Sequence, residues 1–100
     1  MAYETGAFEM TLSAAAGQDA ALFAELREAF LDSVSRQIDL LGRARCDGNW
    51  QVAAMRIKGL GASFHADALL DLAVEAIEGA PGDPLVLRKL NEYLAEITAY

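Results

Sequence analysis

Apolar residues recur every three or four positions along most of this chain, which is the spacing that places them on one face of an α-helix. The longest stripe follows Asp19 and comprises Leu22, Phe23, Leu26, Phe30, Val34, Ile38 and Leu41. Three shorter stripes follow it: Trp50, Ala53, Ala54, Ile57, Leu60, Gly61 and Phe64; then Leu69, Leu70, Ala73 and Ile77; then Leu87, Leu90, Tyr93, Leu94 and Ile97. The pattern predicts helices near residues 19–45, 49–64, 66–79 and 83–98, and no sheet.

Residues that favour helix ends lie between these stripes. Asp19 suits the N-cap of the long helix, and Asn49 suits the N-cap of the next one. Asp83 followed by Pro84 is a strong start signal for the last helix. Before Asp19, a short helix with Phe8, Leu12 and Ala15 on one face ends at Gly17, and we expect it to close one end of the core.

Together these elements predict an all-α protein. Four amphipathic helices joined by short loops pack most simply as an antiparallel up-down four-helix bundle. The 100 residues make one domain, with residues 1–17 as an N-terminal segment containing the short helix and residues 18–98 as the bundle. We expect one core that buries six residues from different helices: Leu26, Phe30, Ile57, Phe64, Leu70 and Leu90.

Composition narrows the classes of partner. The net charge of −7 argues against a nucleic-acid-binding protein. The N-terminus lacks a basic region followed by an apolar run, and no apolar run approaches the roughly 18 residues of a membrane span. A single cysteine, Cys46, excludes an internal disulfide, as expected in a reducing compartment. We therefore expect a cytoplasmic protein with no nucleic acid or membrane partner.

The usual catalytic and metal-binding patterns are missing from the sequence. One histidine and one cysteine cannot supply the usual His/Cys zinc sets. There is no Ser-His-Asp order, phosphate-binding glycine loop or dinucleotide fingerprint, and no Glu-x-x-His pair for a di-iron centre. We expect no enzyme activity, no catalytic residue, no metal and no cofactor.

The third predicted helix contains two glycines, Gly59 and Gly61, although each costs a helix about 1 kcal/mol relative to alanine. If the apolar stripe faces inward, Met55, Lys58, Gly59 and Ala62 form a second, outward stripe at positions i, i+3, i+4 and i+7. Arg56 flanks that stripe. A helix face without side chains lets another molecule approach closely.

This helix resembles the phosphoacceptor helix of histidine phosphotransfer (HPt) domains, whose pattern runs Ala-His-x-Leu-Lys-Gly-Ser-x-x-x-x-Gly-Ala. Five residues fit the pattern: Ala54, Ile57, Lys58, Gly59 and Ala66. Met55 stands at the phosphoacceptor position, and His65 replaces the second glycine. Gly17-x-Asp19, the Phe-rich second helix, Gly48-Asn49-Trp50 before the third helix and the terminal bundle helix also fit in order, so the resemblance spans roughly residues 8 to 98.

The resemblance implies a non-catalytic signalling module that binds a response-regulator receiver domain or a histidine kinase. It implies that Lys58 and Gly59 keep the places that neutralise the phosphoryl group and admit the receiver domain. The expected binding residues are Met55, Arg56, Lys58, Gly59 and Ala62. Arg43 and Arg45 extend a basic patch toward an acidic receiver pocket if they cluster with Arg56 and Lys58.

Other interpretations stay open at this stage. Met55 suits the filling of a gap under the first helix or a loop, and Arg56 and Lys58 suit a solvated surface. His65 suits a helix end, where it interacts with terminal carbonyls; a displaced phosphoacceptor is the alternative, and it makes the chain an active phosphocarrier. A third function is a helical interaction or dimerisation module unrelated to phosphorelay, with a homo-oligomer assembled through Met55.

Overall fold

The computed structural model describes residues 6–99 and contains five α-helices and no strand in that range. The helices are α1 (Ala7–Ala16), α2 (Ala20–Gly42), α3 (Asp47–Ser63), α4 (Asp67–Glu78) and α5 (Pro84–Ala99). The prediction of an all-α protein with a short first helix is confirmed for these residues. Residues 1–5 of the predicted N-terminal segment lie outside the described residues.

Two of the three predicted N-caps are present. The Asp19 carboxylate accepts a hydrogen bond from the Leu22 backbone N–H (3.0 Å), and that of Asp83 accepts one from Leu85 (2.9 Å). The predicted cap at Asn49 is wrong, because α3 begins at Asp47. A carboxylate in the first turn interacts favourably with the helix dipole, so Asp47 stabilises this earlier start.

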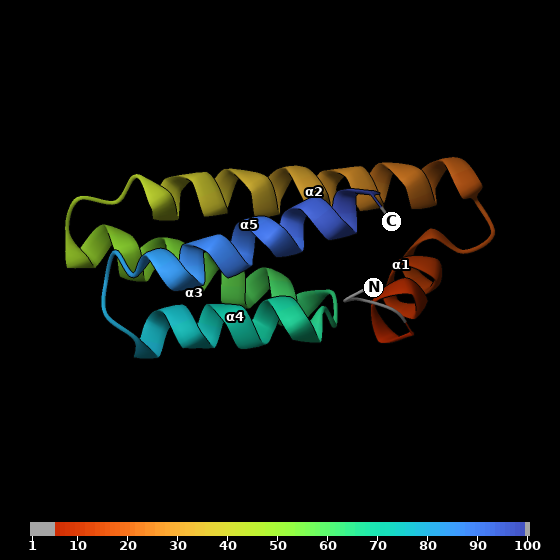
Figure 1. The fold of residues 1–100 in the computed structure, drawn as a ribbon. Coiled ribbons are helices and arrows are strands. Elements are labelled where there is room, and N and C mark those ends of the chain that lie inside the picture. The colour runs from red at the N-terminus through yellow and green to blue at the C-terminus, as the bar shows by residue number, and fades with distance from the viewer. Residues whose placement is uncertain (1–5, 100) are drawn as a thin grey trace.

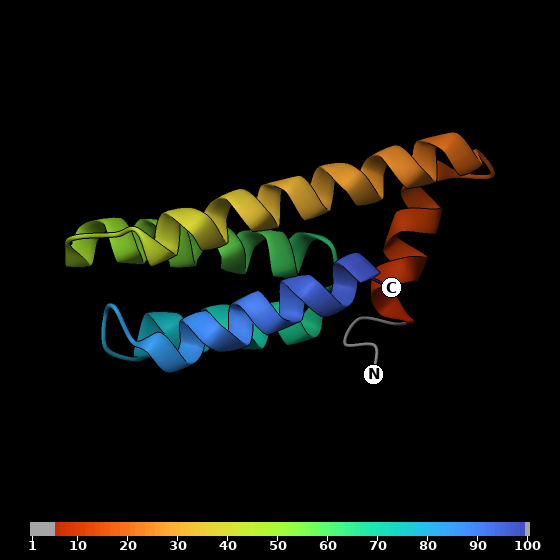
Figure 2. The same cartoon turned by 45° about the horizontal axis from the view of Figure 1, so that its top comes forward.

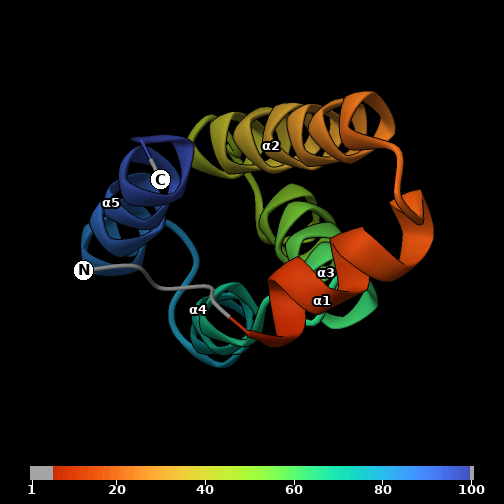
Figure 3. The ribbon, with the colours of Figure 1, turned by 90° about the vertical axis from the view of Figure 1, so that its right-hand side faces the viewer.

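Helices α2 to α5 lie side by side along the long axis of the molecule (Figures 1 and 2). Helix α2 packs against α3 and α5, and α4 packs against the same two helices. Seen from one end, the four helices surround a common centre and α1 lies across that end (Figure 3). Each of the four long helices therefore has two neighbours on which to bury its apolar stripe.

The core is one continuous cluster to which all five helices contribute. Of the six predicted core residues, Phe30, Ile57 and Leu90 are fully buried. Leu26, Phe64 and Leu70 are only half-buried. For Leu70 the reason is the rotation of α4, whose inward face is formed by Leu69, Ala73 and Ala76. Periodicity locates a stripe but does not fix which edge of it meets the core.

Helix α1 covers one end of this core, as predicted. Phe8, Leu12 and Ala16 are buried, so the inward face ends at Ala16 rather than at the predicted Ala15. The ring of Phe30 lies 4.9 Å from that of Phe8 and 4.8 Å from that of Phe64, in tilted arrangements. An aromatic row thus joins α1 to α2 and to the end of α3.

Two side chains of α3 satisfy carbonyl groups at the end of α4, where a helix has no partners of its own for them. The indole Nε1 of Trp50 donates to the Ala76 carbonyl (2.9 Å), and the Gln51 amide donates to that of Ile77 (3.4 Å). These bonds fix how α3 lies against α4, and hence which face of α3 points outward. Within residues 6–99, no helix is both long and apolar enough to cross a lipid bilayer.

Candidate protein-binding surface on α2 and α3

The outward stripe predicted for α3 is exposed in the structure. Met55 is 53% exposed, and Gly59, Ala62 and Lys58 are exposed along the same helix. Met55 is therefore not covered by α1 or by a loop, and the gap-filling interpretation is wrong. Val52, one turn before Met55 and Arg56, is 50% exposed and extends the apolar part of this face.

Gly59 is the barest point of this stripe. A Cβ placed on Gly59 meets no heavy atom of the described residues within 4 Å. Packing within this part of the chain thus does not require glycine at this position. The missing side chain leaves space on the outside of the helix, which is where a partner can approach.

The two basic residues of the predicted site differ in position: Lys58 belongs to the stripe, and Arg56 flanks it. Arg56 borders a groove between α2 and α3, whereas Lys58 does not line that groove. Neither forms an ion pair or a hydrogen bond with any residue in the range 6–99. Both cations are therefore available to a carboxylate or phosphate brought by another molecule.

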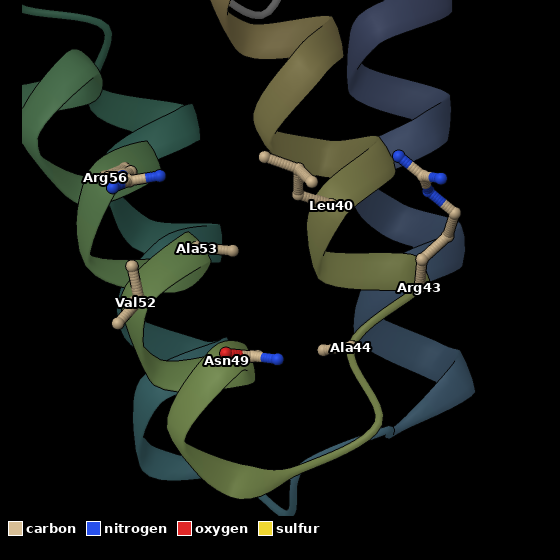
Figure 4. Close-up of a pocket in the computed structure, with 7 residues that line it drawn as sticks. All are labelled: Leu40, Arg43, Ala44, Asn49, Val52, Ala53 and Arg56. Atoms are coloured by element: carbon tan, nitrogen blue, oxygen red, sulfur yellow. The ribbon is translucent and has the colours of Figure 1, made fainter.

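The groove begins near the end of α2 as a surface cavity of about 390 Å³. Its lining is Leu40, Arg43, Ala44, Asn49, Val52, Ala53 and Arg56 (Figure 4). Ala44 and Ala53 face each other across it, and their small side chains leave the space between the helices open (Figure 4). Leu40, which is 38% exposed, adds an apolar wall from α2.

A second cavity of about 380 Å³ continues along the same two helices and shares Arg56 with the first. Its lining includes Arg36, Gln37, Arg56, Gly59, Leu60 and Ser63. We refer to the two cavities together as the α2–α3 groove. The groove thus connects Val52 at one end with Gly59 at the other.

The charge of the groove is opposite to that of the protein. The chain has 15 acidic and 8 basic residues. Of the described residues that line the two cavities, none is a carboxylate, and three are arginines: Arg36, Arg43 and Arg56. Arg43 is already paired with Asp39 (3.0 Å) and points away from the cavity (Figure 4). Arg36 and Arg56 form no ion pair within residues 6–99, so they carry the positive charge of the groove.

The predicted basic patch is present in part. Arg43 and Arg56 border one cavity, while Arg45 lies beyond the end of α2 and lines neighbouring hollows with Ala44. Arg36 was not predicted, although a signal existed: it precedes Arg43 by seven residues and so lies on the same face of α2.

Gln37 supplies an unusual polar group to this groove. Its Oε1 is buried and has no hydrogen-bond partner among the described residues. Buried acceptors in folded proteins are nearly always hydrogen-bonded. Gln37 thus places one unpaired acceptor, among the described residues, at the wall of the groove beside Arg36 and Arg56.

His65 lies apart from the outward stripe, at the turn between α3 and α4. Its φ is +55°, and the N–H groups of His65 and Ala66 bond back to the carbonyls of Ala62 (3.4 Å) and Gly61 (2.8 Å). This is a Schellman ending, which favours glycine at the left-handed position. The terminal carbonyls are thus bound by backbone N–H groups, and the imidazole instead lies against α1, with Nδ1 2.9 Å from Thr11 Oγ1.

Possible metal ligands are scattered in the structure. Within residues 6–99 there is no group of three or more His, Cys, Asp and Glu side chains placed to hold a metal ion. Cys46 is an exposed free thiol just before α3.

Comparison of the chain with models of protein families, with curated proteins and with solved structures found no match. The likeness to histidine phosphotransfer domains therefore rests on the motif residues themselves.

Proposed function

We propose that this chain is a non-catalytic signalling module of the phosphorelay type. It binds a receiver domain or a histidine kinase through the face of α3 formed by Met55, Arg56, Lys58, Gly59 and Ala62. The observation that carries the proposal is Gly59: it stands in open space beside an exposed methionine and two cations that have no ion-pair partner within residues 6–99. Packing among the described residues gives no reason for a glycine at this position.

The proposed fold is the antiparallel up-down four-helix bundle of phosphotransfer domains. In support, the chain reverses direction at each of the three loops that join α2 to α5 (Figure 1). Each long helix also contacts the two helices that such a bundle places beside it. The face around Met55 would then occupy the position at which the family meets its partners.

The chemistry at position 55 makes the module non-catalytic. A phosphoacceptor needs an imidazole nitrogen that attacks phosphorus, and the thioether of Met55 forms no stable phosphoryl adduct. Binding without transfer would let the chain compete with an active phosphotransfer protein or hold a receiver near its kinase. Because those partners act in the cytoplasm, we place the chain there too.

Binding assays test this proposal directly. The chain would be titrated by calorimetry against purified receiver domains and kinase domains of its own organism, alongside Gly59→Leu and Lys58→Glu. We expect Gly59→Leu to abolish binding, because it fills the space that a partner needs. Lys58→Glu should mainly slow association and reduce its salt dependence, as expected for a charge at the rim of an interface.

The stability of the variants decides how the binding result is interpreted. At an exposed helical position, Gly59→Leu should raise the free energy of unfolding by a fraction of the roughly 1 kcal/mol glycine penalty. Loss of binding with unchanged or higher stability supports the proposal. Full binding by Gly59→Leu, or no binding by the unmodified chain to any receiver or kinase, would contradict it.

A second candidate function is an active phosphocarrier that uses His65. The observation in its favour is the contact with Thr11. The Thr11 hydroxyl donates its hydrogen to the Ala7 carbonyl (2.8 Å), so it accepts from Nδ1 of His65 and leaves Nε2 as the free nucleophilic nitrogen. Against it, Ala68 and Leu69 stand where the family pattern needs Lys and Gly.

A further inference from the structure

We propose that the α2–α3 groove binds an acidic amphipathic helix of the partner protein. Its carboxylates would pair with Arg36 and Arg56, and a hydrogen-bond donor between them would meet the terminal amide of Gln37 once that side chain turns toward the groove. The inference shares one premise with the proposed function, namely that a protein partner binds on this side of the molecule. It adds the chemistry of the segment that is recognised.

The form of the groove favours a helix as the occupant. The groove runs along two helices, whose backbone hydrogen bonds are internal, so an extended peptide finds no strand edge to join in residues 6–99. An amphipathic helix instead uses apolar anchors one turn apart, and Leu40 and Val52 offer apolar walls to them. Gly59, at the other end, lets the helix approach α3 closely.

The positive charge of the groove favours a negatively charged partner. Arg36 and Arg56 have no ion-pair partner within residues 6–99, and no described carboxylate lines the groove beside them. A second copy of this chain docked with two-fold symmetry would bring the same arginines toward one another, which like-charge repulsion opposes. An acidic helix from another protein meets no such repulsion.

Gln37 adds a requirement for a particular kind of side chain. Its buried Oε1 has no donor among the residues that the structure describes, and the cavity that Gln37 lines is also lined by Arg36 and Gly59. The oxygen has almost no exposed surface, so an occupant would reach it only if the Gln37 side chain turned toward the groove, where an occupant without a donor would leave it unpaired. The docked helix should therefore present a hydroxyl or amide N–H where it passes Gln37.

Designed peptides test the charge of the occupant. The probe is an 18-residue alanine-based helix with a leucine stripe flanked by glutamates and one central serine; its control carries lysines in place of the glutamates. Nuclear magnetic resonance of the ¹⁵N-labelled full chain should show shifts at Arg36, Gln37, Arg56 and Gly59 with the acidic peptide alone. Equal binding of both peptides, or shifts confined to other helices, would overturn the proposal.

Charge-reversed variants locate the binding. Arg36→Glu should weaken binding of the acidic peptide about tenfold, the effect of reversing a well-placed charge pair. Arg88→Glu makes the same charge change at an exposed position of α5 outside the groove and should leave the affinity unchanged. If both variants lose affinity equally, only the overall charge matters and the groove is not the site.

Paired substitutions in the peptide and in the chain test whether a donor of the docked helix bonds to Gln37. The unmodified chain should prefer the serine peptide over one with valine at the centre, and Gln37→Leu should reverse that preference. No change of preference would exclude the contact with Gln37. Concentration-dependent shifts of Arg36 and Gly59 without peptide would show a second copy in the groove and overturn an acidic partner.

The two proposals fail separately. If receiver and kinase domains do not bind but the acidic peptide does, the signalling function is wrong and the groove assignment holds. If a receiver binds and its affinity is unaffected by Arg36→Glu and Gln37→Leu, the signalling function holds and the groove assignment is wrong.

Discussion

Gly61 and Leu70 are in direct backbone contact between α3 and α4. A Cβ on Gly61 would lie 2.8 Å from the backbone nitrogen of Leu70 and 2.9 Å from its Cα. Gly59, only two residues earlier, would meet nothing within 4 Å in the described part of the chain. The two glycines of this helix therefore have different reasons to be there: one permits close packing, and the other leaves an outward face bare.

The first prediction compares alanine at these two glycines. Gly61→Ala should lower the free energy of unfolding by about 1–3 kcal/mol, because α4 must shift to admit the methyl group. Gly59→Ala should raise it by up to about 1 kcal/mol, because alanine is the better helix former and meets no obstacle. Urea denaturation followed by circular dichroism measures both. Equal effects of the two substitutions would contradict the packing role of Gly61.

A second prediction concerns the aromatic row at the end of the core. Phe30 is 1% exposed and its ring contacts those of Phe8 and Phe64. Phe30→Ala should destabilise the protein by about 3–5 kcal/mol through lost burial and the cavity left behind. Phe30→Leu keeps much of the volume and should cost clearly less. Thermal unfolding of both variants is the measurement, and a small loss for alanine would show that α1 does not seal the core.

Trp50 provides the third prediction. Trp50→Phe removes the donor to the buried Ala76 carbonyl and should cost about 1–3 kcal/mol for the unpaired acceptor, in addition to lost packing. Gln51→Ala is the control, because its bond to the next carbonyl is longer and only part-buried. Chemical denaturation should rank the tryptophan variant well below the glutamine variant. The reverse order would mean that Trp50 acts through packing alone or not at all.

The sequence predicted the helices well and their rotation less well. Start signals such as Asp19 and Asp83 are local, since each side chain bonds to its own helix. The burial of Leu69 in place of Leu70 depends on how α4 turns against α3, which the Gly61 contact and the Trp50 bond determine. No periodicity within one helix contains that information.

The candidate surface, too, could be predicted from the sequence only in part. The exposure of Met55 and Gly59 follows from helical geometry, and the sequence predicted it. The groove could not be predicted, because it depends on which residues of α2 lie opposite which residues of α3. Arg36 and Gln37 become relevant only when that register places them beside Arg56 and Gly59.

A fourth prediction addresses phosphoryl transfer. Incubation with a phosphorylated receiver domain should leave the chain unlabelled, because Met55 cannot hold a phosphoryl group. Met55→His restores the family residue beside Lys58 and Gly59, and we expect it to gain acid-labile label. Label on the unmodified chain that disappears in His65→Ala would instead establish His65 as the acceptor. Autoradiography after electrophoresis at neutral pH distinguishes these outcomes.

The last prediction concerns the contact between Thr11 and His65, which joins α1 to the turn after α3. Thr11→Val keeps the shape of the side chain and removes the hydroxyl, so it should lower the free energy of unfolding by about 0.5–1.5 kcal/mol. His65→Gly removes the imidazole and also relieves the left-handed backbone at φ +55°, which costs an ordinary residue about 1–2 kcal/mol. A double-mutant cycle separates the two effects.

Thr11→Val should cost almost nothing once His65 is glycine, and His65→Gly should stabilise the protein most in the Thr11→Val background. If the two substitutions are simply additive, the hydrogen bond contributes no stability and α1 is held by its buried apolar residues, Phe8, Leu12 and Ala16.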